Sequence, residues 1–166
     1  MRITQFRGRP VVDRATARTL GTIADVFVDA PGAQIIAVEV AHPGCAECVC
    51  IPAEWITHIG SGAVMVARRA GGDLAETARV TEHCLNCKSL VGLEVLDESG
   101  NRVGNLHDAD VNLPQLAITR FELVPSGWCH WLKRRSQIQP DEVASCSRDI
   151  MLIRSSRVAS EPDPVA

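Results

Sequence analysis

The chain contains one pattern of turns and apolar runs twice over, and this duplication is the feature that most constrains its fold. Leu20-Gly21 followed by Asp25 in the first half corresponds to Val103-Gly104 followed by Asp108 in the second. The same register pairs Val28 with Val111, Pro31 with Pro114, Ile35 with Ile118 and Glu39 with Glu122. Self-similarity at a constant spacing is the mark of a repeated structural unit. We therefore expect two consecutive copies of one unit.

Each copy consists of short strands. Residues 23–28 and 35–40 are rich in β-branched side chains and are separated by a turn that contains Pro31 and Gly32. Runs of this length and composition, bounded by turn residues, are typical of strands with one buried face. Residues 138–143 and 150–153 correspond in the same way to residues 51–56 and 63–66. The prediction is an all-β protein.

The repeated features come in a characteristic order. A strand ends in Asp, the next strand starts Leu-Gly or Val-Gly and carries Asp after the glycine, a turn contains proline, and Ile-Pro-Ala-Glu follows at residues 51–54. This order resembles the PRC-barrel family, named after the cytoplasmic part of the photosynthetic reaction-centre H subunit and also found in ribosome maturation factors. The resemblance covers roughly residues 8–66 and 90–153.

The resemblance implies a small β-barrel that serves assembly and docking and not catalysis. Gly21 and Gly104 correspond to the family's turn glycine, and Asp25 and Asp108 to the acidic residue on the following strand. Each unit offers this one acid without an obvious partner, so we interpret both carboxylates as structural, with a functional role as the alternative. The membrane helix of the photosynthetic relatives and the different barrel of the ribosomal relatives are missing, so neither of those tasks carries over.

The expected architecture is two tandem small PRC-like β-barrels joined by a cysteine-containing linker. We place the first barrel at residues 1–70, the linker at 71–89, the second barrel at 90–154 and a flexible tail at 155–166. A barrel of this size has a thin hydrophobic core, because small domains bury a smaller fraction of their surface. Such a protein would gain from an additional link between its two units.

Two C-x-x-C pairs could supply that link. Cys45 and Cys48 lie in the first repeat, and Cys84 and Cys87 lie just before the second. Four thiolates from two such pairs suit a tetrahedral zinc site, so we predict structural zinc at these cysteines, with iron as the alternative metal. His42, Cys50 and His83 could each replace one ligand. The other interpretation is a set of free or redox-sensitive thiols.

A second candidate site lies in the loop of the second repeat that corresponds to the cysteine loop of the first. The loop combines aromatic area with positive charge, a composition enriched at protein interfaces and at membrane surfaces. The predicted docking residues are Trp128, Trp131, Lys133, Arg134 and Arg135. Alternatively, the tryptophans cover the open end of the barrel. We have no role for Cys129, and we expect Cys146 to be a small buried residue.

The composition excludes several classes of partner. With a net charge of −3 the chain has no general attraction for nucleic acid or anionic lipid. Its start lacks the apolar core of a signal peptide, and no run is long enough for a membrane helix, so we expect a cytoplasmic protein that could sit at the periphery of a membrane complex. In the cytoplasm its seven cysteines would stay reduced.

The sequence therefore favours a non-catalytic assembly or docking protein that binds a larger protein complex. No nucleophile pattern or phosphate-binding loop is present, so we do not expect an enzyme. A metal- or thiol-based redox or electron-transfer accessory protein is the first alternative. An RNA- or ribosome-associated factor, suggested by residues 133–135, is the second. The sequence also leaves open whether the protein forms a homo-oligomer.

Overall fold

The computed structural model describes residues 1–44, 48–67, 79, 81–82, 84–125 and 136–154. In the first half these residues form η1 (Ile3–Phe6), β1 (Pro10–Asp13), β2 (Thr19–Asp29), β3 (Gln34–Ala41), β4 (Cys48–Pro52), η2 (Ala53–Trp55), β5 (Ile56–Ile59) and β6 (Val64–Val66). Then come β7 (Leu85–Asn86) and α2 (Cys87–Leu90). The second half contains β8 (Glu94–Asp97), β9 (Arg102–Asn112), β10 (Ala117–Pro125), β11 (Ser136–Ile138), η3 (Pro140–Glu142), β12 (Val143–Cys146) and β13 (Ile150–Ile153). Among these residues no helix has the length and apolar character to cross a membrane.

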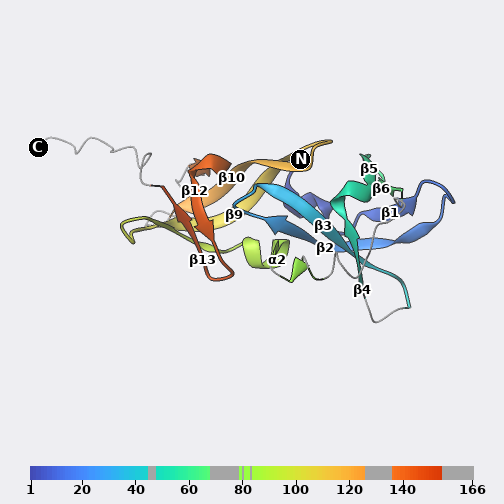
Figure 1. Cartoon of the computed structure of the whole chain (residues 1–166), viewed down its shortest axis with the longest axis horizontal. Coiled ribbons are helices and arrows are strands. Elements are labelled where there is room, and N and C mark those ends of the chain that lie inside the picture. Colours follow the sequence, from blue (N-terminus) through green and yellow to red (C-terminus); the bar gives the residue numbers. More distant parts are fainter. Residues whose placement is uncertain (45–47, 68–78, 80, 83, 126–135, 155–166) are drawn as a thin grey trace, which may run out of the picture.

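The all-β prediction is confirmed, but the strands are joined in a way that the sequence did not indicate. They form one mixed sheet of 13 strands, in which the main path runs β12-β13-β8-β9-β10-β3-β2-β1-β6-β5. The two halves meet where β10 pairs with β3, and Figure 1 shows them at opposite ends of an elongated molecule. Within the described residues the path does not return to its first strand. The two separate closed barrels expected from the sequence are therefore not recognised.

The repeat is visible in the pairing of the strands. β1 lies antiparallel to β2 and parallel to β6, and β8 lies antiparallel to β9 and parallel to β13. β3 pairs with both β2 and β4, as β10 pairs with both β9 and β11. β2 and β9 each span 11 residues, and their burial patterns differ at one position. Strands that correspond in the sequence repeat therefore also make the same pairings in the structure.

The repeated glycines allow one close backbone approach in each half. A Cβ atom on Gly21 would overlap the carbonyl group of Ala41 at the end of β3, and Gly21 has a φ of +147°. A Cβ atom on Gly104 would overlap the carbonyl group of Val124 near the end of β10. Only glycine leaves room for such an approach. Each glycine is therefore required where one long strand passes close to the end of its partner.

The buried apolar side chains form one cluster that runs through both halves. It includes Val26 and Val38 from the first half and Leu106 and Phe121 from the second. Residues outside the repeated strands also belong to it, namely Ile3 and Phe6 of η1 and Cys87 and Leu90 of α2. The thin separate cores expected for residues 1–70 and 90–154 are thus continuous, because short segments from each side contribute to the same packing.

Candidate functional site at the joint between the halves

The predicted cysteine ligands have very different surroundings. Cys45 lies outside the described residues, Cys48 is exposed at the start of β4, and Cys84 is half-buried just before β7. Cys87 is 1% exposed and belongs to the hydrophobic core. The described residues contain no group of three or more His, Cys, Asp or Glu side chains that could hold a metal ion. With Cys45 outside the description, the four-cysteine site stays a prediction.

A hydrogen bond from the Cys87 backbone N–H group fixes the position of this residue. It begins the α2 turn, and its N–H donates to Asp25 Oδ1 over 3.1 Å. The pKa of the Cys87 thiol is raised to about 11, mainly by burial and in addition by the Asp25 and Asp108 carboxylates, while Arg7 opposes the shift. A buried thiol with this pKa is protonated at neutral pH and unreactive. In the metal-free protein the side chain therefore behaves as a core residue.

The segment before β7 lies against strand β4. The Thr81 hydroxyl donates to the sulfur of Cys50 over 4.0 Å, and the Cys84 N–H donates to the Thr81 carbonyl over 3.1 Å. Burial is the main cause that raises the pKa of the Cys50 thiol, and burial followed by the Asp29 carboxylate raises that of Cys84. Part of the predicted linker thus contacts the strand that carries Cys48. This contact brings segments of both C-x-x-C pairs into one region.

Asp25 and Asp108 are the buried carboxylates that the sequence left without partners, and the structure supplies those partners. Their side chains are 1% and 4% exposed. Asp25 accepts hydrogen bonds from the Val26 and Cys87 N–H groups, and the Lys88 ammonium lies 3.9 Å from its Oδ2. Asp108 accepts from the Ala109 N–H and from the Thr4 hydroxyl. Each carboxylate therefore anchors a segment that precedes the opposite repeat, which favours the structural interpretation.

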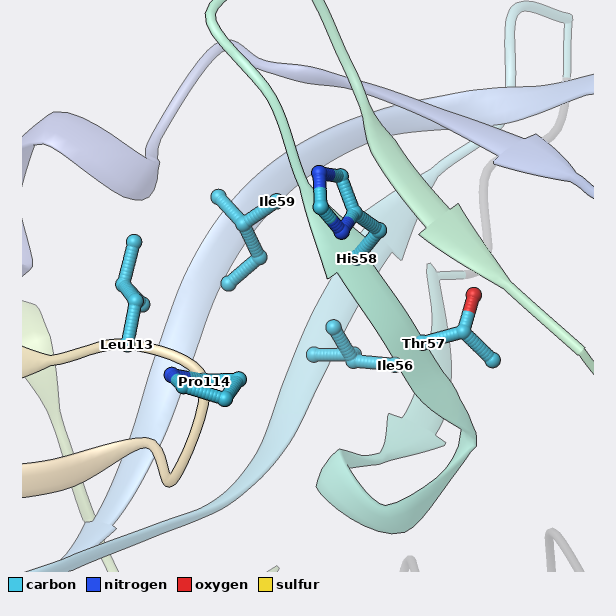
Figure 2. A pocket seen from close by; sticks show the side chains of 6 residues that line it. All are labelled: Ile56, Thr57, His58, Ile59, Leu113 and Pro114. Carbon is cyan, nitrogen blue, oxygen red and sulfur yellow. The ribbon is translucent and has the colours of Figure 1, made fainter.

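A pocket that sequence reasoning missed lies between the two halves. Its volume is about 390 Å³, and it is lined by Ile56, Thr57, His58, Ile59, Leu113 and Pro114. Figure 2 shows the β5 side chains of the first half on one side and the turn between β9 and β10 of the second half on the other. Thr57 and His58 are exposed. The lining is mostly apolar, and no single-strand pattern in the sequence could reveal a pocket built from two halves.

The predicted docking residues cannot be located in the same way. Trp128, Trp131, Lys133, Arg134 and Arg135 lie outside the described residues, as does Cys129. Cys146, expected to be buried, is half-buried at the end of β12, and burial raises the pKa of its thiol to about 11. The docking loop stays a prediction from composition.

Comparison with known proteins identifies the first half. Residues 1–72 match the family model of the PRC-barrel domain. The chain therefore carries one PRC-barrel domain there, as the order of strands and turns indicated. The match does not show a second copy in the other half. No curated protein matches the chain.

Proposed function

We propose that this protein is a non-catalytic assembly protein in which two PRC-barrel-like modules bind a larger protein complex. The observation that carries the proposal is the PRC-barrel domain at residues 1–72, followed by a second half with the same order of strand pairings. In this proposal the second half is a diverged copy of the first. The two modules differ in one loop, which carries cysteines in the first and tryptophans and basic residues in the second. The cytoplasmic location expected from the sequence is part of the proposal.

Structural details beyond strand order support a duplicated module. Register shifts occur between Val11 and Val12 in the β1–β2 pair and between Val95 and Leu96 in the β8–β9 pair, at corresponding positions. A short 3-10 turn precedes both β5 and β12. Bulges and turns of this kind arise from local backbone requirements, so their recurrence is difficult to explain by hydrophobic patterning alone.

The docking surface proposed here is the loop at residues 126–135. Its two tryptophans can supply apolar contact area, and Lys133, Arg134 and Arg135 can pair with acidic groups on a partner. Within a protein of net charge −3, this loop concentrates positive charge. Such a loop suits an acidic protein surface better than nucleic acid, which favours a more widely basic protein.

The cysteines act structurally in this proposal. A zinc ion held by Cys45, Cys48, Cys84 and Cys87 would tie the linker to the first module, with iron as the alternative metal. The raised pKa values of Cys50, Cys84 and Cys87 keep these thiols protonated at neutral pH when no metal is bound. Thiol redox chemistry needs a thiolate, so the surroundings of these cysteines weigh against the redox alternative.

Affinity purification of the full chain from its native source tests the proposal. We expect a stoichiometric protein partner that is lost from the Trp128→Ser/Trp131→Ser variant and kept by Val49→Ser, a control at an exposed apolar side chain of β4. Circular dichroism checks that both variants fold. A chain that elutes alone under gentle conditions overturns the assembly function. A partner kept by the folded double variant overturns the assignment of the loop.

A further inference from the structure

The two halves hold each other through exchanged segments. We call residues 1–6 the first arm and residues 85–90 the second arm. The first arm precedes the first repeat but lies on β9 of the second half: Met1 and Val111 exchange two backbone hydrogen bonds of 3.0 and 2.7 Å, and Arg2 forms a β-bridge with Asp110. Figure 1 accordingly shows the amino terminus near the middle of the elongated molecule.

The first arm then turns onto the buried carboxylate of the second half. In η1, the Thr4 hydroxyl donates to Asp108 Oδ2 over 2.6 Å and the Thr4 N–H donates to Oδ1 over 3.4 Å. Ile3 and Phe6, on either side of Thr4, are 0% exposed. The arm thus combines two strand hydrogen bonds and a charge-assisted hydrogen bond to β9 with two fully buried apolar side chains, in a turn that packs against both β9 and β2. Peptide-binding sites use the same combination.

The second arm makes the reciprocal set of contacts. It precedes the second repeat but lies on β2 of the first half, where Leu85 pairs with Val28 and Asn86 pairs with Phe27. Its α2 turn places the Cys87 N–H on Asp25, and Leu90 is 0% exposed. In the repeat register, Val28 and Asp25 correspond to Val111 and Asp108. Each arm therefore occupies the equivalent position on the opposite half.

The pairing between β3 and β10 has the same symmetry. Gln34 faces Ala117, and these two residues correspond to each other in the repeat register. The Ile35 N–H donates to the Leu116 carbonyl over 3.0 Å, and the Ile118 N–H donates to the Ala33 carbonyl over 2.7 Å. Contacts in which one residue meets its own counterpart are the property of an isologous, two-fold interface. An approximate two-fold axis therefore passes between Gln34 and Ala117.

We infer that the chain is a covalently linked counterpart of an arm-exchanged dimer, in which each half is a binding site for the arm of the other. The partner that fits the site at Asp108 is a short segment that pairs with β9, buries two apolar side chains and donates to the carboxylate. The first arm is that segment. This inference does not depend on an external partner, so it can fail or hold separately from the proposed docking function.

Cutting the folded chain tests the inference. A protease site inserted between Gly71 and Gly72 allows the full-length protein to fold before it is cut into its two halves. We expect the halves to elute together in size-exclusion chromatography at micromolar concentration. Asp108→Asn combined with Thr4→Val should weaken their association at least about ten-fold, because a hydrogen bond to a charged group is lost. Halves that separate in the unsubstituted protein overturn the inference.

Matched variants keep the result interpretable. Thr4→Ser retains the hydroxyl and should behave as the unsubstituted chain, and Thr22→Val changes an exposed threonine of β2 and should do the same. Equal association of the Thr4→Val/Asp108→Asn and Thr22→Val proteins contradicts the role of the arm. Should the double variant fail to fold, hydrogen exchange on the intact Thr4→Val chain replaces it: the Val111 amide should exchange at least about ten-fold faster while the Ile35 amide is unchanged. Unchanged exchange at Val111 overturns the inference.

Discussion

Thr4 and Asp108 are 104 residues apart in the chain, yet the Thr4 hydroxyl donates to Asp108 Oδ2 over 2.6 Å. Asp108 is 4% exposed, so its carboxylate is removed from water and depends on such donors. We expect Thr4→Val to lower the free energy of unfolding by about 1–3 kcal/mol, since it leaves a buried charged acceptor without its shortest hydrogen bond. Urea denaturation measures the change. Thr22→Val is the control, and a loss of equal size there would contradict the prediction.

The repeated glycines give a second prediction. Gly21→Ala and Gly104→Ala should each destabilise the fold by about 1–3 kcal/mol, because the added methyl group would overlap the carbonyl groups of Ala41 and Val124. Thermal unfolding followed by circular dichroism measures both effects. Gly62→Ala is the matched control, since a Cβ atom there meets nothing within 4 Å. Should Gly104→Ala unfold at the same temperature as Gly62→Ala, the close approach is not a constraint.

The buried thiol of Cys87 makes stability depend on pH. Its pKa is raised from 9.0 to about 11 in the folded protein, so between these values the folded state binds more protons than the unfolded state. This contribution to stability is fully present below pH 9 and is lost as the pH rises toward 11. Urea unfolding at a series of pH values should show a smaller loss above pH 9 for Cys87→Ala than for the unsubstituted chain. Identical pH profiles would argue against this burial, and Cys48→Ala, at an exposed position, serves as control.

The metal prediction is tested by elemental analysis of protein purified without a chelator. We expect one zinc or iron ion per chain, and its loss from the Cys84→Ser variant but not from Cys146→Ser. Visible absorption distinguishes iron, because zinc bound by thiolates is colourless. Folded protein without metal would end the four-cysteine assignment. The contact between Thr81 and Cys50 of β4 does not depend on a metal and would be unaffected by that result.

The sequence predicted what depends on local pattern. The repeat register, the strands that begin near Gly21 and Gly104, and the turns at Pro31 and Pro114 follow from alternation and turn chemistry. These features need no knowledge of distant contacts. The match of residues 1–72 to the PRC-barrel domain confirms the family resemblance for the first half.

The remaining features depend on which distant segments meet. Met1 and Arg2 pair with β9 over a stretch too short to have a periodicity of its own. The sequence also indicated no partner for Asp25 or Asp108, because their distant donors, Cys87 and Thr4, lie in the short segments that precede the opposite repeats. Cys87 belongs to a C-x-x-C pair in the sequence, but the α2 turn directs it to the core. Spacing identifies a candidate ligand, and only packing decides whether it faces an ion.

The exchange of arms has a consequence for synthesis on the ribosome. The first arm is translated well before β9, the strand that receives it, which ends at Asn112. Until β9 has been made, the arm therefore lacks the strand with which it pairs, and folding must bridge a sequence separation that makes contact formation slow. Two neighbouring nascent chains would present matching arms and strands to each other. A cell that makes this protein has to favour the contact within one chain over the same contact between two.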